Sequence, residues 1–404
     1  MTHAPIAPPE GQRPPGPVAS GPAPAPEPVA AEPAGRRPVP RLYALDGLRL
    51  VAALAVLAFH WTAYAGVPEV WGGKVPADFM PYIARFTSYG WLGVQLFFIV
   101  SGFVICMSCW GRRPGDFFVS RVIRIFPGFW AAVLLTAGVL MLMPEHGRPG
   151  ARTGLDLQSV LANFTMFPGQ LGHTYVDGVY WTLWMELQFY LLFAVVVTMG
   201  LTYRRAVAFC GIWAAAALVA PQAEIQLVES FAMPNESPYF IGGVAMFLMH
   251  RFGPSLLLWG IVGFTWLVAL SRIRQLKAPY EGATGHPLSW AVVATIITLC
   301  YLVILAVALG YLDGIRWQGL TVAGALTYPL YLIHQEAGWT LIHWLRTQGI
   351  GSAAALATAL AVALLTAWLI HRLVERPLGT LMKRHLNKSL TVMRAASDTR
   401  HPER

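Results

Sequence analysis

Charged side chains are scarce in this chain. Only 12% of its 404 residues are Asp, Glu, Lys or Arg, whereas 56% are hydrophobic. Soluble domains carry roughly 25% charged residues, so a chain with half that share needs surroundings of low polarity for most of its length. The scarcity excludes an ordinary soluble domain and predicts a protein that crosses the membrane several times.

Cysteines are also few, and their spacing does not indicate a metal or redox site. Cys106 and Cys109 form a C-x-x-C pair, whereas Cys210 and Cys300 stand apart. No second Cys or His pair lies nearby, as a zinc motif would require. All four lie in or at the edge of apolar segments, where thiols pack as small hydrophobic groups. We therefore expect no bound metal.

Prolines are concentrated at the start of the chain. Residues 1–40 hold thirteen of the 30 prolines, and such a composition is predicted to be disordered. We divide the chain into a disordered Pro/Ala-rich segment at 1–40, a ten-helix membrane domain at 41–378 and a basic cytoplasmic tail at 379–404. The tail is short, so we expect no appended soluble catalytic domain.

Ten apolar segments follow residue 40, and each is close to the ~20 residues that a helix needs to cross a bilayer. The fold class that they predict is an all-α membrane protein, a bundle of about ten transmembrane helices. The segments lie at about 45–66, 88–109, 124–143, 178–200, 203–220, 238–251, 254–271, 290–311, 320–344 and 352–374. Pro377 is expected to end the tenth helix.

The net charge is +9, which the positive-inside rule explains without any nucleic-acid partner. An even number of helices places both termini on one side of the membrane. If that side is cytoplasmic, the cytoplasmic segments carry 20 Lys and Arg residues and the outer loops carry eight. This difference predicts a multi-pass protein of the cell inner (cytoplasmic) membrane with both termini in the cytoplasm.

The first apolar segment, LDGLRLVAALAVLAFHW at 45–61, contains two ionisable residues that are costly in lipid. Arg49 and His60 are eleven residues apart, which places them within roughly 20° on one helix face and about 16 Å apart along the axis. Asp46 lies one turn before Arg49. Arg49 either reaches the interface or binds a phosphate. His60, deep in the membrane, is a candidate base.

Three further groups of polar residues lie in apolar segments. Arg121 and Arg124 share a helix face and fit either anionic lipid or a bound polyanion. Glu186 needs a partner in its apolar, aromatic surroundings, and the candidates are His60 or an arginine. The segment LTYPLYLIHQEAGWTLIHWL at 326–345 adds tyrosines and histidines.

A bundle with a His, a Glu, tyrosines and arginines directed inward is typical of either a membrane-embedded enzyme or a transporter. Transporters often contain internal repeats, and none is visible here. The residues alone leave both classes open, the second being a multi-pass transporter of a polar or anionic solute.

Five motifs occur in the chain in the order that is typical of one family. Through them residues 41–378 resemble the acyltransferase 3 family of ten-helix membrane O-acyltransferases. They are Arg49-x10-His60, GVQLFFIVSGFVI at 93–105, Arg121-x-x-Arg124 in FFVSRVIRIFP, the block Trp181…Glu186…Phe189-Tyr190, and Tyr331-x-x-His334. The chain departs from the family at Ser120, where a basic residue is common, and at Thr182 and Thr327, where Ser is common. The last two changes keep a hydroxyl.

The resemblance implies an acyltransferase that moves an acyl group, acetyl by default, from cytoplasmic acyl-CoA to a hydroxyl. The acceptor would be a glycan, a lipid-linked sugar or a secondary metabolite. Acyl-CoA is then a co-substrate, and no cofactor is bound permanently. The expected partners are acyl-CoA, the hydroxyl-bearing acceptor and membrane lipid, and the oligomeric state stays open.

The resemblance also implies roles for residues. His60 would take the proton from the acceptor hydroxyl, and Glu186, if it reaches the imidazole, would fix its tautomer. Arg49, Arg121 and Arg124 would bind the phosphates of CoA. The remaining family positions are expected to contact substrate: Trp181, Tyr190, Tyr331 and His334.

Overall fold

The structure is a computed structural model that describes residues 1–2, 42–143 and 155–398. The described part of the membrane domain is helical and contains no strand, which confirms the all-α fold class. Each of the ten predicted segments overlaps a long helix, although α5 begins ten residues before the segment predicted at 124–143. These are α1 (Tyr43–Thr62), α4 (Gly93–Cys109), α5 (Pro114–Leu142), α7 (Trp181–Thr198), α8 (Tyr203–Ala223), α10 (Ser237–Phe252), α11 (Leu256–Ser271), α13 (Trp290–Ala308), α14 (Gly319–Ile333) and α16 (Ser352–Ile370). The disorder predicted for residues 1–40 concerns positions that lie, apart from the first two, outside the described residues.

Shorter helices connect the long ones. They are η1 (Pro68–Trp71), α2 (Pro76–Phe79), α3 (Pro81–Thr87), η2 (Gly90–Leu92), α6 (Leu157–Asn163), η3 (Pro168–Leu171), η4 (Gly178–Tyr180), α9 (Gln226–Ala232), α12 (Ile273–Thr284) and α15 (Glu336–Thr347). The predicted segment 320–344 is therefore divided, because α14 ends before His334 and α15 begins after Gln335.

Length and hydropathy support several membrane crossings. Among the described residues, seven helical segments are long and apolar enough to cross a membrane. The pair α11 and α12, bent by 45°, makes an eighth if it counts as one span. The chain is thus a multi-pass membrane protein, and the number ten stays a prediction.

The helix α10 forms the centre of the bundle, since every residue from Ser237 to Met249 is buried. It packs closely on α4 because glycines on both helices leave no side chain between them. A Cβ on Gly243 would collide with the carbonyl of Ile99, and one on Gly102 would collide with that of Phe240. Small residues let membrane helices approach in this way.

The helix α1 lies between α4 and α14. Gly90, just before α4, lies against the backbone of Ala55, and Gly93 lies against that of Ala52, so α1 and α4 run in opposite directions. Gly324 lies against Asp46, whereas His334 lies against His60, so α14 runs parallel to α1. We call the end where α1 begins the arginine end and the end where it finishes the histidine end.

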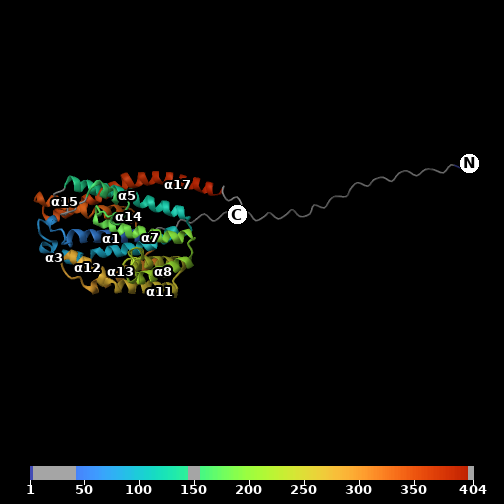
Figure 1. Cartoon of the computed structure of the whole chain (residues 1–404), viewed down its shortest axis with the longest axis horizontal. Helices are drawn as coiled ribbons and strands as arrows, with labels where there is room; N and C mark the ends of the chain where they lie inside the picture. Colours follow the sequence, from blue (N-terminus) through green and yellow to red (C-terminus); the bar gives the residue numbers. More distant parts are fainter. Residues whose placement is uncertain (3–41, 144–154, 399–404) are drawn as a thin grey trace. The chain divides into compact units, whose positions relative to one another are not determined.

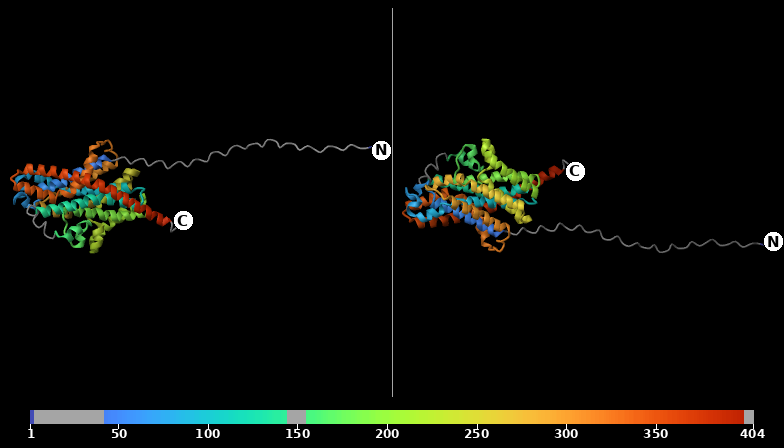
Figure 2. Two further views of the ribbon diagram at one scale, coloured as in Figure 1. Left: turned by 90° about the horizontal axis from the view of Figure 1, so that it is seen from above. Right: turned by 90° about the horizontal axis from the view of Figure 1, so that it is seen from below.

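The last helices form one continuous rod, which corrects the expectation that Pro377 ends the tenth helix. A π turn at His371–Glu375 follows α16 and leads into α17 (Arg376–Asp398). Pro377 is the second residue of α17, where the missing N–H of proline is tolerated. Figure 1 shows α17 beside α5, and both views of Figure 2 show it extending past the neighbouring helices.

The contact between α4 and α10 gives a test of this packing. Gly243→Ala should lower the free energy of unfolding by about 1–3 kcal/mol, because the added methyl group forces the two backbones apart. The measurement is thermal unfolding of the purified protein in detergent.

The matched control is Gly138→Ala on α5, where nothing lies within 4 Å of the added Cβ. This change should leave stability unchanged or raise it by up to about 1 kcal/mol, since Ala is the better helix former. Equal effects of the two substitutions would contradict the close approach of α4 and α10.

Candidate active site

A cavity lies between α1, α4, α5, α7 and α14. Its empty volume is about 850 Å³. It is lined by Arg49, Val94, Phe97, Phe98, Ser101, Val104, Ile105, Arg121, Arg124, Ile125, Thr182, Leu183, Glu186, Tyr190, Gly324, Thr327, Tyr328 and Tyr331. Six of the nine residues singled out from the sequence therefore line one cavity, although they come from four helices.

The three arginines of the cavity differ in their partners. Arg49 Nη1 lies 3.9 Å from Asp46 Oδ1, one turn earlier on α1. Arg121 donates only to the neighbouring Ser120 hydroxyl, at 3.3 Å. Arg124 is exposed and makes no ion pair with the described residues. Two guanidinium groups are thus available to an anion that enters the cavity.

Glu186 faces the same cavity, where two hydroxyl groups hold it. Its Oε1 accepts a hydrogen bond from Ser101 on α4 at 2.7 Å and another from Tyr190, one turn further along α7. The carboxylate also lies within electrostatic reach of Arg49. A carboxylate in an apolar bundle needs such donors and cations to stay charged.

His60 was one of the two candidate partners of Glu186, and the structure does not bring these residues into contact. No hydrogen bond or ion pair joins these two described side chains. The second turn of α7 instead directs Glu186 toward α4 and the arginines. The neighbour of the His60 ring is His334, whose Nε2 lies 3.1 Å from His60 Nδ1.

The predicted substrate residues occupy different positions. Tyr331 and Tyr190 line the cavity, and the Tyr331 hydroxyl lies 2.9 Å from that of Thr182. Trp181 is half-buried and packs its ring against Phe98. His334 is 1% exposed, so its side chain is enclosed by protein. Contact of these residues with substrate stays a prediction.

The two histidines are fixed through their backbones by two buried tryptophans. Trp61 donates its indole N–H to the carbonyl of His334 at 2.7 Å, and Trp339 donates to the carbonyl of His60 at 2.8 Å. The Tyr331 carbonyl, at the wall of the cavity, accepts from His334 Nδ1 at 2.7 Å. The cavity is therefore connected to the histidine pair through Tyr331.

Aromatic rings surround His60 at the histidine end. The rings of Tyr64 and Trp339 have their centres 6.1 Å and 5.9 Å from that of His60. Tyr280 on α12 stacks on Trp91 with 3.9 Å between ring centres and lies 5.8 Å from Phe59. These rings form an apolar wall with two hydroxyl groups, as a ligand with both polar and apolar faces requires.

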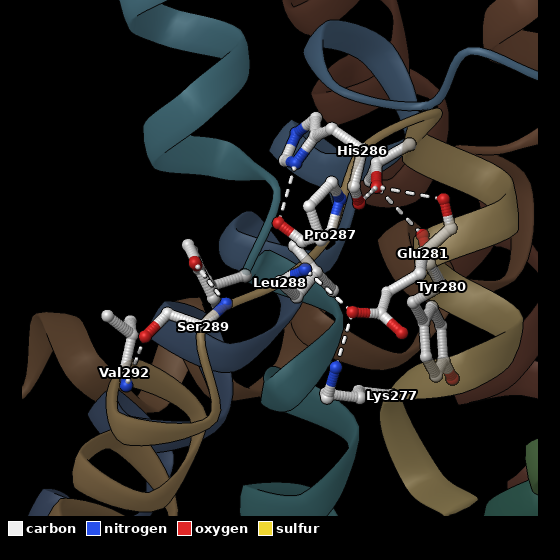
Figure 3. Close-up of polar contacts among 10 residues, drawn as sticks. Lys277, Tyr280, Glu281, His286, Pro287, Leu288, Ser289 and Val292 are labelled. Carbon is white, nitrogen blue, oxygen red and sulfur yellow. Dashed lines mark hydrogen bonds and ion pairs between the residues drawn. The ribbon is translucent and has the colours of Figure 1, made fainter. Parts of the chain in front are cut away.

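A polar network fixes α12 in this position (Figure 3). Glu281 accepts from Lys277 and from the backbone of Leu288, the latter at 2.8 Å. The following loop is joined to the turn before α4, because His286 Nε2 lies 3.0 Å from the hydroxyl of Ser88 and the Tyr89 hydroxyl accepts from the backbone of residue 289 at 3.0 Å. The network holds Tyr280 against the end of α1.

The described residues contain no cluster of three or more His, Cys, Asp or Glu side chains suited to a metal ion. The four cysteines are buried free thiols. The groups arranged for binding are instead the cationic side chains of Arg49, Arg121 and Arg124, which suit an anionic ligand.

Ser101 was not found from the sequence, whereas Thr182 was noted only as a departure from the family and Tyr328 only as one of the tyrosines at 326–345. Ser101, Thr182 and Tyr328 line the cavity and bind other groups in it, and Tyr328 donates to the carbonyl of Ile125 at 3.0 Å. Ser101 stands inside the segment GVQLFFIVSGFVI, where a lone hydroxyl among apolar residues was the available signal. The pairing of His60 with His334 joins positions 274 residues apart, and no local pattern indicates it.

Comparison with known proteins identifies the class. Residues 42–372 match the family described as an acyltransferase domain, which is most of the chain. The protein therefore belongs to the acyltransferase 3 family, as the five motifs predicted.

Three relatives show where the similarity extends. The chain is 28% identical over 393 residues to the acyltransferase MdmB of Streptomyces mycarofaciens, covering 86% of this chain and 94% of that protein. It is 26% identical over 304 residues to the exopolysaccharide production protein ExoZ of Rhizobium meliloti (strain 1021), covering 72% and 89%. An O-acetyl transferase of Shigella phage Sf6 is 28% identical over 160 residues, covering 38% and 45%. No solved structure matches the chain.

The hydroxyl groups that hold Glu186 give a second test. Ser101→Ala should lower the free energy of unfolding by about 2 kcal/mol, because hydrogen bonds to charged groups are worth about 1.5–3 kcal/mol. The measurement is thermal unfolding in detergent.

Ser108→Ala is the matched control on the same helix, since this hydroxyl donates to the backbone carbonyl of Ile105 and does not contact Glu186. It should change stability by less than about 0.5 kcal/mol. A loss at Ser101 no larger than at Ser108 would show that Glu186 does not depend on the α4 hydroxyl.

Proposed function

We propose that the protein is an integral membrane O-acyltransferase that takes an acyl group from acyl-CoA and transfers it to a hydroxyl of an acceptor. The observation that supports the proposal best is the placement of Arg49, Arg121 and Arg124 along one cavity, the last two without an ion pair among the described residues. Arginine forks suit phosphate oxygens, and CoA carries several phosphates.

The arginine end is then the cytoplasmic end, where acyl-CoA is found. This agrees with the excess of basic residues in the segments at that end. We propose on this basis that both termini lie in the cytoplasm and that the protein lies in the cytoplasmic membrane. A donor whose phosphates bind the arginines extends its thioester arm along the cavity toward Tyr331 and the histidine pair.

His60 acts as the general base in this mechanism. Its Nε2 removes the proton from the acceptor hydroxyl while the hydroxyl oxygen attacks the thioester carbonyl. The tetrahedral intermediate collapses, the carbon–sulfur bond breaks, and the CoA thiolate takes the proton back from the imidazolium. The products are the acyl ester and free CoA, and His60 returns to its neutral form.

Two observations support a class of acceptor: the names of the relatives and the aromatic rings near His60. Two relatives are named for exopolysaccharide production and O-acetyl transfer. A sugar presents hydroxyl groups at its edge and C–H groups on its faces, which fit the rings of Tyr64 and Trp339 near His60. We therefore propose a glycan or a glycosylated metabolite as acceptor and acetyl as the default acyl group.

A transporter of an anionic solute is the competing function, since a cationic cavity in a helix bundle also suits transport. The two differ in chemistry. Purified protein with radiolabelled acetyl-CoA and a panel of glycans should release free CoA and yield a labelled ester. Binding of acetyl-CoA without release of CoA, with every acceptor of the panel, would favour transport.

Substitution of His60 tests the proposed base. His60→Gln should lower kcat by at least about 100-fold, because general base catalysis contributes about 10²–10⁴-fold. The KM for acyl-CoA should stay within about three-fold, since the arginines remain. The measurement is ester formation by the purified variant.

His343→Gln on α15 serves as the control, because the same change falls outside the histidine pair. It should retain wild-type kcat. A His60 variant that folds and acylates at the wild-type rate would rule out this base.

Substitution of Arg124 tests the donor site. Arg124→Ala should raise the KM for acyl-CoA by about ten-fold or more, because a charge-assisted hydrogen bond is worth about 1.5–3 kcal/mol. The affinity for the acceptor should not change. Initial rates at varied acyl-CoA and fixed acceptor give both constants.

Arg113→Ala is the matched control, because Arg113 precedes α5 and does not line the cavity. It should leave the KM unchanged. Equal KM values for acyl-CoA in the Arg124→Ala and Arg113→Ala variants would indicate that Arg124 acts at the lipid interface instead.

A further inference from the structure

Two backbone carbonyls determine where the protons of the histidine pair lie. A carbonyl oxygen only accepts hydrogen bonds. His334 Nδ1 lies 2.7 Å from the Tyr331 carbonyl, so this nitrogen carries a proton. His60 Nδ1 lies 2.9 Å from the Val56 carbonyl and carries a proton for the same reason.

The contact between the two rings is then determined as well. A neutral imidazole has one N–H and one lone pair, so His334 Nε2 accepts. The proton on His60 Nδ1, 3.1 Å away, is shared between His334 Nε2 and the Val56 carbonyl. If His60 Nδ1 carried no proton, its lone pair would face the lone pairs of the Val56 carbonyl oxygen. His60 Nε2 therefore holds the free lone pair, and it has no hydrogen-bond partner among the described residues.

We propose that His334 is the positioning residue of the proposed general base, in the place where the sequence predicted Glu186. This inference rests on the proposed acyltransferase function. When His60 Nε2 takes the acceptor proton, the imidazolium keeps its Nδ1–H bound to the lone pair of His334 Nε2. The pair holds one added proton, which leaves with the CoA thiolate, and His334 itself stays neutral throughout.

A neutral histidine suits this place better than a carboxylate would. A carboxylate beside His60 would bury a charge in an apolar site whenever the base is unprotonated, which is costly. His334 orients the ring and accepts its proton without a permanent charge. The arginine end keeps Glu186 for a different purpose, since that carboxylate lies among cations and hydroxyl groups.

The break between α14 and α15 creates this geometry. Because α14 ends at Ile333, the carbonyl of His334 is free to accept from Trp61 at 2.7 Å. The new helix begins at Glu336, whose backbone N–H donates to Asp177 at 3.1 Å. Both ends of the break thus have partners, and His334 is held at a fixed distance from α1.

The decisive experiment compares two substitutions of similar size at one position. The amide oxygen of Gln lies where Nε2 of His lies and can accept the His60 proton, whereas Leu fills the space without an acceptor. His334→Gln should retain at least about a tenth of wild-type kcat. His334→Leu should lose about 100-fold in kcat while the KM for acyl-CoA stays within about three-fold.

Other outcomes overturn the inference. Equal kcat values for the Gln and Leu variants, whether both are active or both inactive, would show that an acceptor at this position does not matter. A loss in the Leu variant that appears in KM rather than kcat would place His334 in substrate binding. Wild-type protein that yields no ester with any acceptor would contradict the proposed function instead, so the two failures are distinguishable.

A second measurement uses the wild-type protein and does not depend on the folding of variants. Diethyl pyrocarbonate acylates an accessible imidazole nitrogen that carries a lone pair. Peptide mass spectrometry should find modification at His60 and at the exposed His385, but none at His334. Modification of His334, or an unmodified His60 beside a modified His385, would overturn the assigned proton positions.

Discussion

The cost of placing polar groups in a membrane determines the arrangement of this protein. Ionisable side chains in a bundle of apolar helices need partners, and most of those described here have one within the protein. Glu186 is held by Ser101 and Tyr190, and the histidines are held by each other and by backbone carbonyls. Arg121 and Arg124 lack an acidic partner among the described residues and line a cavity. This unbalanced positive charge is the observation on which the proposed anion site rests.

The proposed mechanism assigns two chemical tasks to different ends of α1. The arginine end, where Arg49 joins the two arginines of α5, is the proposed anion site, and the histidine pair at the other end is the proposed site of proton transfer. The separation keeps the cations away from His60, whose protonation they would oppose. Tyr331 links the two regions, since its side chain lines the cavity and its carbonyl fixes the proton of His334.

The sequence predicted the helical class, the approximate segments and six of the residues that line the cavity, because hydropathy and isolated polar residues are local signals. The approach of α4 and α10 through Gly102 and Gly243 could not be predicted, since glycine is common in membrane helices. The sequence left His60 and the arginines open as partners of Glu186, because a sequence shows which groups need partners but not which helices face each other. The continuation through Pro377 was missed because a π turn leaves no hydropathy signal.

The rod formed by α16, the π turn and α17 extends the folded part of the chain beyond the region of family similarity. The family similarity stops at residue 372, in the π turn. Yet α17 packs against the half of α5 that carries the arginines: Cβ atoms built on Gly115 and Gly379 would lie 2.8 Å from Leu390 and 3.3 Å from Ile123. The family similarity therefore ends within the continuous helical rod whose last part, α17, packs on α5. Chimeras between relatives should exchange α5 and α17 together, because the two helices pack directly on each other.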